Sequence, residues 1–509
     1  MLQVFHGKEW RGIPVNVRHS ITPIGEKRTD IDLTRQWKTI DWKKVRSYVN
    51  RLQTRIAKAT REGKWNLVKR LQYLLTHSYY GKLLAVRIVT QNQGARTPGI
   101  DGERWLRPHE KMQATLSITC NRYKAKPLKR IYIPKPGKDT KRPLSIPTMY
   151  DRAMQALYAL ALQPVAETCA DKRSFGFRLF RSAQDAAQYA FICLHNPKSA
   201  QWILEGDIKG CFDNISHNWL EKNIPMDRSV LSQFLKAGYV FEQNLYHTDR
   251  GTPQGGIISP ILANITLDGI ESILDEQYPD MKVHFIRYAD DFMVTAPSKE
   301  VAEEICELIR IFLTERGLEL SESKTLITHI NDGFDFLGWS FRKYDGILLI
   351  KPSRESIRKV TDKIHEIIHK ATAWNQEQLI QALNPVIIGW SNYHRHIVAK
   401  ETFQKLDHIV WNMLWRWAKR RHPQKDRRWV ARRYWHTEAS RNWVFKTETT
   451  KLVMFADTTI RRHNMVKLNR NPYLDRKYFL ERLDKARKST PWIQTRFSYF
   501  AYCRPADGL

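Results

Sequence analysis

Two short apolar segments near the middle of the chain each lead into acidic residues. Residues 283–296 read VHFIRYADDFMVTA, in which two apolar, β-prone runs flank the polar sequence Ala289-Asp290-Asp291. This pattern predicts a β-hairpin whose tip carries two adjacent carboxylates. Residues 201–207 read QWILEGD and predict a strand that ends on Asp207. Taken alone, the hairpin tip is as typical of a structural turn as of a metal site, because Asp is common in turns.

Most other apolar residues recur every three or four positions, which predicts helices. Residues 1–40 lack this period and are expected to form an irregular lead-in. Asp41 is the expected N-cap of a basic helix that ends before Gly63. Residues 124–147 predict a basic hairpin, since a Pro-Gly turn separates two extended segments. Further helices are predicted over residues 65–75, 151–166, 257–273, 301–316 and, as an α-rich block, 353–421.

The composition indicates a large and strongly basic globular protein. The 509 residues and their 42% apolar content fit about three or four domains with real cores. The formal net charge of +32 implies a polyanionic partner. A membrane surface would also attract this charge, but no apolar run reaches the length of about 18 residues that a membrane-spanning helix needs. The 17 Trp and 20 Tyr are interleaved with Lys and Arg, which favours nucleic acid because bases stack on these side chains.

The cysteines and histidines indicate neither a disulfide framework nor a zinc site. None of the six cysteines is paired at metal-ligand spacing, and His394-Arg395-His396 has no Cys or carboxylate at such a spacing. The first residues, MLQVFHGKEWRGIPV, contain no signal-peptide core. We therefore expect a reducing, cytoplasmic compartment and no membrane.

Three carboxylates, one at a strand end and two at a hairpin tip, suit a pair of hard cations. Mg²⁺ prefers oxygen ligands and keeps positions open for phosphates and water. Two such ions can activate an attacking hydroxyl and stabilise the leaving oxygen in a phosphoryl transfer. Asp207, Asp290 and Asp291 are therefore the predicted site of two Mg²⁺ ions, whose charge offsets that of the carboxylates.

Three motifs of this chain resemble those of one polymerase family in their order and spacing. They are DIKGCFDNI from Asp207, GTPQGGIISPILANI from Gly251, and YADD at residues 288–291. They resemble the polymerase motifs of group II intron-encoded reverse transcriptases, also called maturases, and the resemblance extends over nearly the whole chain. It implies an RNA-directed DNA polymerase that binds its group II intron RNA, assists splicing and reverse transcribes the intron during retrohoming. The implied partners are the intron RNA, target DNA and dNTPs, whereas the sequence indicates no oligomeric state.

The resemblance also implies the architecture. The expected fold is an α+β right-hand polymerase, with an antiparallel sheet in the fingers and palm, an α-helical thumb and a small basic C-terminal domain. Residues 1–92 would form a helical extension that binds RNA, and residues 93–345 the fingers and palm. Residues 346–421 would form the thumb, or maturase X domain, and residues 422–509 a DNA-binding domain.

The last part of the sequence offers no frame for an additional nuclease module. Many relatives continue into a His-Asn-His endonuclease that carries cysteine pairs. Cys503 is the only cysteine after Cys306, so no zinc-stabilised cysteine frame can form. We therefore expect the form of the family that lacks the C-terminal endonuclease domain.

Roles for individual residues follow from the resemblance. Asp207 and Asp290 would ligate the metal ions, with Asp291 as a further ligand or an electrostatic support. This trio is the expected catalytic and metal-binding site. Both carboxylate motifs are intact, which argues against a chain that has lost its polymerase function.

Five further residues are expected around the incoming nucleotide. Lys135 and Arg142 in the basic hairpin would bind its triphosphate, although the hairpin is also consistent with a charged surface feature. Phe212 would exclude a 2′-hydroxyl or, alternatively, pack in the core. Gln254 would lie beside the nascent base pair. Lys324 would protonate the leaving pyrophosphate, with an ordinary surface lysine as the alternative.

Basic residues outside this group are the expected contacts to nucleic acid. Two lie in the hairpin as neighbours of Lys135 and Arg142, two lie in the block SFGFRLFRSAQD, where packing is the alternative, and six lie in the most basic stretch, residues 416–433. In chain order they are Lys129, Arg130, Arg178, Arg181, Arg420, Arg421, Arg427, Arg428, Arg432 and Arg433.

Two other functions remain compatible with parts of the sequence. The first is a reverse transcriptase of another kind, such as a retron enzyme, against which the helical thumb and the basic C-terminal region argue. The second is a maturase that binds RNA without polymerase activity. Primer extension with dNTPs on an RNA template separates an active polymerase from a protein that only binds RNA.

Overall fold

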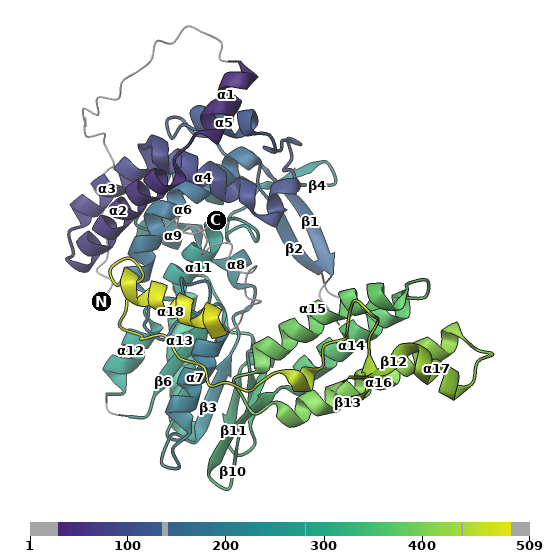
Figure 1. Ribbon diagram of the computed structural model, residues 1–509. Coiled ribbons are helices and arrows are strands. Elements are labelled where there is room, and N and C mark those ends of the chain that lie inside the picture. The colour runs from purple at the N-terminus through teal and green to yellow at the C-terminus, as the bar shows by residue number, and fades with distance from the viewer. Residues whose placement is uncertain (1–28, 135–140, 280, 439–440, 490–509) are drawn as a thin grey trace.

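The computed structural model describes residues 29–134, 141–279, 281–438 and 441–489. Helices from the first part of the chain lie at the top of the view in Figure 1, and a four-stranded sheet, here called the palm sheet, lies below them. A helical block, here called the thumb, projects to the right, and the last helix returns to the centre. This mixed α+β arrangement agrees with the right-hand polymerase fold that we predicted.

The N-terminal helices form one layer against a long central helix. The predicted N-cap is confirmed, because Asp41 accepts hydrogen bonds from the backbone N–H groups of Lys43 and Lys44. Gly63, with φ 67°, follows the end of that helix as predicted. The helices are α1 (Asp30–Lys38), α2 (Trp42–Arg61), α3 (Trp65–His77), α4 (Tyr79–Gln91), the short 3₁₀ helix η1 (Gln93–Arg96), α5 (Pro108–Ser117) and the buried α6 (Met149–Cys169).

The prediction of an irregular lead-in is wrong over α1. Thr29 caps this helix by accepting a hydrogen bond from the backbone N–H group of Asp32. Leu33 is the one residue of α1 that is buried, and the helix packs against α5. A single apolar anchor leaves no sequence period to detect, so tertiary packing decides the structure here. The rest of the predicted lead-in, residues 1–28, lies outside the described residues.

A second four-stranded sheet, here called the fingers sheet, contains the predicted basic hairpin. Strands β1 (Leu128–Pro134) and β2 (Lys141–Ile146) pair antiparallel, which confirms that hairpin. The sequence did not predict β4 (Tyr239–Phe241) and β5 (Asn244–Tyr246), which extend the sheet in the order β2-β1-β4-β5. Each of these strands has three residues, too few for an alternating pattern to be recognised.

The palm sheet is antiparallel in the order β6-β7-β3-β8. Its strands carry apolar residues toward both faces: Leu204 and Val294 belong to the core beneath the N-terminal helices, and Ile203 and Met293 to the core shared with the thumb. Burial of both faces explains why these strands read as continuous apolar runs. The strands are β3 (Trp202–Gly206), β6 (His284–Tyr288), β7 (Asp291–Ala296) and β8 (Leu326–His329).

The helix predicted over residues 257–273 is wrong in one respect, because the structure breaks it into two. It ends at Leu267, and a new helix begins at Ile270 after Gly269, whose φ is 114°. The break turns the Asp268 carboxylate inward, 2.5 Å from the guanidinium of the fully buried Arg287. The helices around the palm are α7 (Ala183–Leu194), α8 (Cys211–Asn214), α9 (His217–Asn223), α10 (Arg228–Leu235), α11 (Ser259–Leu267), α12 (Ile270–Gln277), α13 (Lys299–Thr314) and the 3₁₀ helix η2 (Glu322–Lys324).

The α-rich block predicted over residues 353–421 is confirmed as the three thumb helices. A three-stranded sheet connects them to the palm, and a short helix and a small hairpin follow them. These elements are β9 (Phe334–Phe336), β10 (Trp339–Tyr344), β11 (Ile347–Pro352), α14 (Arg354–Lys370), α15 (Gln376–His394), α16 (Lys400–Arg421), α17 (Arg427–Tyr434), β12 (Trp435–Glu438), β13 (Arg441–Phe445) and the 3₁₀ helix η3 (Phe455–Asp457).

The chain then crosses back from the thumb to the palm and ends its described part in α18 (Arg476–Ser489). Asp185, at the start of α7, is fully buried, and its carboxylate binds residues of this returning segment. Its Oδ1 atom lies 2.9 Å from Nε2 of His463 and 2.6 Å from the guanidinium of Arg482. The returning segment also reaches the N-terminal helices, since Thr54 donates a hydrogen bond to the backbone oxygen of Tyr473. One buried carboxylate therefore joins the palm to the last part of the fold.

Candidate active site

The three predicted carboxylates lie at the same end of the palm sheet. Tyr288 pairs with Asp291 where β6 turns into β7, and Ala289 in the turn has φ 60°. Strand β3 lies beside β7, with Gly206 opposite Phe292, so Asp207 follows β3 directly beside the hairpin tip. The pairing of these strands, and not closeness in the sequence, brings the carboxylates together.

Two glycines permit close approaches behind this tip. A Cβ atom on Gly206 would lie 2.1 Å from the ring of Phe292, and one on Gly176 would lie 2.2 Å from the backbone nitrogen of Ala289. Residues with side chains would therefore push apart the segments that hold the carboxylates. Gly176 was not among the predicted site residues, although it lies in the block SFGFRLFRSAQD that the resemblance had marked.

Burial and neighbouring negative charge raise the pKa values of two carboxylates, Asp290 and Asp291. Burial in the site, followed by the negative charges of Asp290 and Asp207, raises the pKa of Asp291 to about 7. A hydrogen bond between Asp291 and Asp207 acts in the same direction. Burial and the charge of Asp207 also raise the pKa of Asp290, whereas the positive charges of Lys324 and Arg142 oppose this. The site is thus short of positive charge.

Lys324 provides the nearest positive charge. Its Nζ atom lies 2.5 Å from Oδ2 of Asp207, and this hydrogen bond raises the pKa of the ammonium group. The backbone supports the contact, because the N–H group of Ser321, just before η2, donates to the carbonyl oxygen of Asp207. A cation that binds Asp207 must therefore compete with Lys324.

The carboxylates of Asp207, Asp290 and Asp291 suit hard cations, although their oxygen atoms do not yet surround a common point. Within the described residues, no three Asp, Glu, His or Cys side chains are already arranged as a metal-binding group. The observation that favours cations is the grouping of three carboxylates at one sheet end, where burial and then neighbouring negative charge raise the pKa values of Asp290 and Asp291. Oxygen-only donors of this kind suit Mg²⁺ rather than zinc.

Two of the predicted nucleotide-binding residues, Arg142 and Lys324, carry charges that act on the carboxylates. Arg142 is exposed on β2, and its charge reaches Asp290. Phe212 on α8 is half-buried and lies edge-to-face with the exposed Phe177, at 6.1 Å between ring centroids. Gln254 donates a hydrogen bond of 2.9 Å to Asp213. Lys135 lies outside the described residues.

Two of the predicted nucleic-acid contacts are wrong. Arg178 and Arg181 are buried, and their guanidinium groups donate to protein oxygens. Arg178 forms an ion pair of 2.8 Å with Glu167, and both arginines donate to the carbonyl oxygen of Ser174. These two arginines hold together the loop behind the hairpin tip, which was the packing alternative for this block.

The other predicted contacts lie nearer the surface. Lys129 is exposed, and Arg130 stacks on the ring of Tyr239 at 3.8 Å. Arg421 is half-buried and donates to the carbonyl oxygens of Thr372 and Trp374, so part of its donor capacity is used within the thumb. The exposed members are Arg420, Arg427, Arg428, Arg432 and Arg433.

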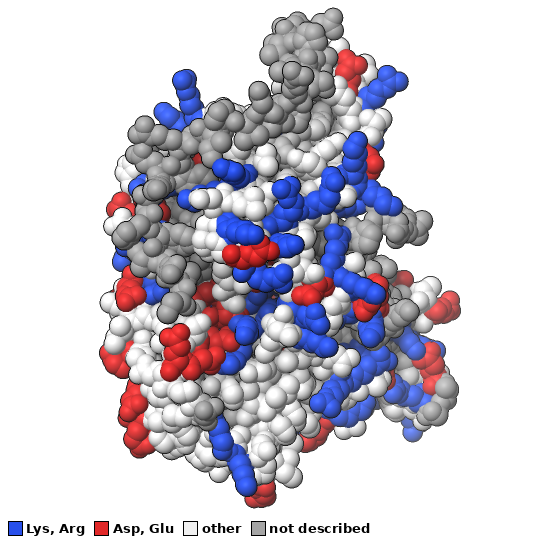
Figure 2. All heavy atoms as spheres, turned by 90° about the vertical axis from the view of Figure 1, so that its left-hand side faces the viewer, with Lys and Arg blue, Asp and Glu red and all other residues white. Residues whose placement is uncertain are grey.

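The surface charge is unevenly distributed. Figure 2 shows Lys and Arg gathered in a broad band through the middle of one face, with Asp and Glu mainly at its left margin. Helix α2 lies on this side of the molecule (Figure 1). Its exposed basic side chains are Lys43, Lys44, Arg51, Arg55, Lys58 and Arg61. Such a band attracts a polyanion over a large area.

Among the described residues, none of the helices has both the length and the apolar character needed to span a bilayer.

Comparison with known proteins identifies the family. The family described as "Reverse transcriptase (RNA-dependent DNA polymerase)" matches residues 133–341. The "N-terminal domain of reverse transcriptase" matches residues 37–118, and the "Group II intron, maturase-specific domain" matches residues 357–435. These three matches follow one another along the chain and cover the N-terminal helices, the fingers and palm, and the thumb.

Individual relatives agree with these matches. Group II intron-encoded protein LtrA of Lactococcus lactis subsp. cremoris is 30% identical over 426 residues, covering 66% of this chain and 70% of that protein. Protein YkfC of Escherichia coli (strain K12) is 32% identical and covers 50% of this chain and 78% of its own length. Maturase-like protein 1 of Euglena gracilis is 28% identical, and the match covers 70% of this chain and 76% of that protein. The chain therefore belongs to the group II intron-encoded reverse transcriptases, RNA-directed DNA polymerases that carry a maturase domain.

Proposed function

We propose that this chain copies its own group II intron RNA into DNA at the carboxylates of the palm sheet, with dNTPs as substrates and target DNA as a partner. The observation that carries the proposal is the meeting of Asp207, Asp290 and Asp291 at one sheet end, where burial and neighbouring negative charge raise the pKa of Asp291 and favour bound cations. Asp207 and Asp290 would hold two Mg²⁺ ions, and Asp291 would complete or support the site. When bound, such ions activate the primer 3′-hydroxyl and neutralise charge on the departing pyrophosphate.

The chain's own residues would position the substrates. Arg142 of the fingers sheet acts electrostatically on Asp290 and would bind the triphosphate of the incoming dNTP. Gln254, fixed by its hydrogen bond to Asp213, would contact the nascent base pair. Lys324 would leave Asp207 when cations bind there, and its proton would then pass to the departing pyrophosphate.

The maturase function would use the basic surfaces outside the palm. The band of Lys and Arg in Figure 2 and the exposed arginines of α17 would bind the phosphates of the intron RNA and, at the C-terminal side, of the target DNA. Binding through such contacts should weaken steeply with added salt, because each phosphate contact releases counterions.

Primer extension on an RNA template tests the polymerase part of the proposal and its metal requirement. The purified protein is expected to extend an annealed DNA primer with dNTPs when Mg²⁺ is present and to stop when EDTA removes the cations. A gel-shift measurement in the same buffers serves as the control, since RNA binding through basic residues does not require Mg²⁺ at the carboxylates. Extension that continues in EDTA would contradict the assignment of the carboxylates.

The choice of sugar should depend on Phe212. Its ring is held half-exposed by the edge-to-face contact with Phe177 and borders the motif that begins at Asp207. Phe212→Val is expected to relax the preference for dNTPs over rNTPs by about tenfold or more, because space opens beside the 2′-carbon. Steady-state incorporation of dCTP and CTP opposite the same template base measures this preference. Phe191→Val is the matched control, because it truncates a half-buried phenylalanine of α7 that stacks on His195 and not on Phe212. An unchanged ratio in Phe212→Val would exclude the role.

A further inference from the structure

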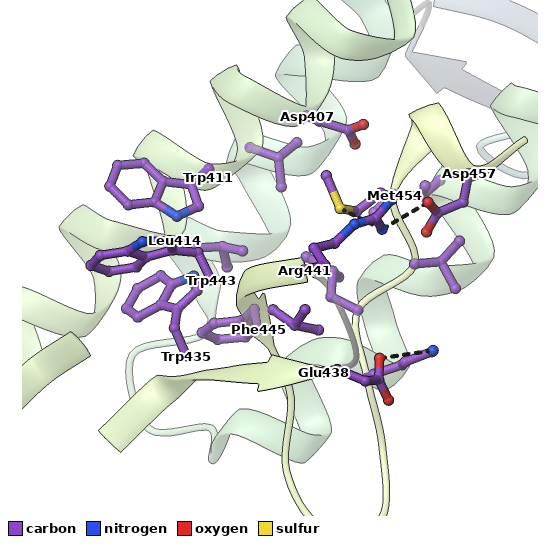
Figure 3. Close-up of a pocket in the computed structure, with 16 residues that line it drawn as sticks. Asp407, Trp411, Leu414, Trp435, Glu438, Arg441, Trp443, Phe445, Met454 and Asp457 are labelled. Atoms are coloured by element: carbon purple, nitrogen blue, oxygen red, sulfur yellow. Dashed lines mark hydrogen bonds and ion pairs between the residues drawn. The ribbon is translucent and has the colours of Figure 1, made fainter. Parts of the chain in front are cut away.

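A small pocket lies between thumb helix α16 and the hairpin β12–β13, away from the carboxylates. Figure 3 shows Trp411, Trp435 and Trp443 together on one side of it and Arg441, Met454 and Asp457 on the other. Its volume is about 70 Å³. This space holds a few water molecules. A whole aromatic ligand does not fit into this space. Only the edge of its flat ring could enter, and the face of the ring would lie against a side chain that lines the pocket.

Trp443 is the unusual member of the wall. Its backbone has φ 64°, a conformation that is costly for a bulky side chain, and its exposed fraction is 53%. Burial therefore does not explain why a tryptophan is kept in this conformation. An edge-to-face contact with Trp411, at 5.9 Å between ring centroids, fixes the orientation of the exposed indole. The strain at Trp443 thus presents a flat aromatic surface to the solvent.

Polar groups near this surface could form hydrogen bonds with a ligand that has a polar edge. Trp435 is 5% exposed and lines the pocket, yet its indole N–H has no acceptor within the described part of the chain. A buried donor without a partner is costly, and a ligand acceptor would satisfy it. On the opposite side, Arg441 is held at 2.8 Å from Asp457 and remains half-exposed.

The charges of the pocket favour a nucleobase over a basic side chain from another protein. Tryptophans and carboxylates together would suit a cation, but the three carboxylates that line the pocket already have partners. Asp407 accepts hydrogen bonds from the backbone N–H groups of Phe455 and Ala456. Glu438 lies 3.1 Å from Lys451, and Asp457 is paired with Arg441. In addition, helix α17 immediately precedes Trp435 and exposes four arginines that can bind phosphates: Arg427, Arg428, Arg432 and Arg433.

We propose that this pocket binds an unpaired base of RNA, stacked on Trp443 with its polar edge at the indole N–H of Trp435. The adjacent phosphates would lie on the arginines of α17. RNA is the expected source, because the match to the maturase-specific domain, residues 357–435, includes both Trp411 and Trp435. The inference rests on the proposed binding of intron RNA, but it concerns a site separate from polymerisation.

The test uses the full chain and two RNA hairpins that differ at one unpaired position, which carries either adenine or no base. Base stacking on an aromatic side chain is worth about 5- to 100-fold in affinity, so the wild type should prefer the adenine hairpin by a factor in this range. Trp443→Gly removes the ring and suits the positive φ; it should reduce the preference to about one. Trp443→Tyr should keep most of the preference, because the stacking surface remains.

Trp374→Ala is the matched control, since it removes another partly exposed tryptophan of the thumb that does not line the pocket. It should leave the preference unchanged. Trp443→Gly should also keep the wild-type salt dependence of RNA affinity, because no phosphate contact is lost, and its rate of primer extension should be unchanged. An equal preference in wild type and Trp443→Gly would overturn the proposal. A preference seen with the corresponding DNA hairpins alone would overturn it as well.

Discussion

Asp290→Asn is expected to abolish dNTP incorporation while leaving RNA affinity nearly unchanged. The amide keeps the shape of the side chain but removes the charge that would hold a metal ion. A bound metal supplies several kcal/mol of transition-state stabilisation, so the loss should be about a thousandfold or more in the rate of primer extension. Asp207→Asn should have a similar effect, because this carboxylate follows the neighbouring strand of the same sheet end.

Asp335→Asn is the matched control for these two variants. Asp335 is an exposed carboxylate on β9, outside the hairpin tip, and its replacement should leave extension near the wild-type rate. Gel-shift titration with the same RNA checks that binding survives in all three variants. Primer extension near the wild-type rate in either Asp290→Asn or Asp207→Asn would show that the catalytic site lies elsewhere.

Arg287→Met is expected to produce the largest loss of stability. Arg287 is fully buried near the end of β6, two residues before Ala289 in the hairpin turn. Its guanidinium donates hydrogen bonds to Asp268, Asn264 and the carbonyl oxygen of Ala289. Removing one partner of a buried ion pair leaves the other charge without compensation, at a cost of about 3–5 kcal/mol. The melting temperature should fall clearly, and the position of the catalytic hairpin should loosen with it.

An exposed ion pair provides the comparison. Arg310 and Glu307 lie 3.2 Å apart on the solvent side of α13, with 46% and 64% of their side chains exposed. Such pairs contribute about 0–1 kcal/mol, so Arg310→Met should barely change the melting temperature. Thermal unfolding of both variants at one protein concentration measures the difference. Equal melting temperatures for Arg287→Met and wild type would mean that Asp268 is compensated without this arginine.

The elements that the sequence predicted are those whose pattern is local. The hairpin tip with Asp290 and Asp291, the N-cap Asp41 and the thumb helices each follow from residues within one short window, and the structure has them. The position of Asp207 beside the hairpin tip depends on the pairing of β3 with β7, which no local pattern specifies. The family motifs supplied that information, because they link segments that are far apart in the chain.

Apart from helix α1, the errors arose where a polar side chain points inward. Arg178 and Arg181 have the composition of a nucleic-acid contact, yet their donors are used by carbonyl oxygens and by Glu167. The break at Gly269 serves the ion pair between Asp268 and Arg287 and is invisible in an apolar helical pattern. Arg287 itself offered a signal, since a single charge in the apolar strand HFIRY must have a buried partner.

The junction at Asp185 also has a consequence for how the protein is made. Arg482, which pairs with Asp185, lies 297 residues further along the chain. At about 5–20 residues per second, a ribosome needs about 15–60 seconds to add that distance. During this time the carboxylate of Asp185, which is buried in the finished protein, must stay in contact with water. The start of α7 in a nascent chain therefore cannot reach its final packing until the last described helix has left the ribosome, so this part of the palm should mature only after the thumb has been synthesised.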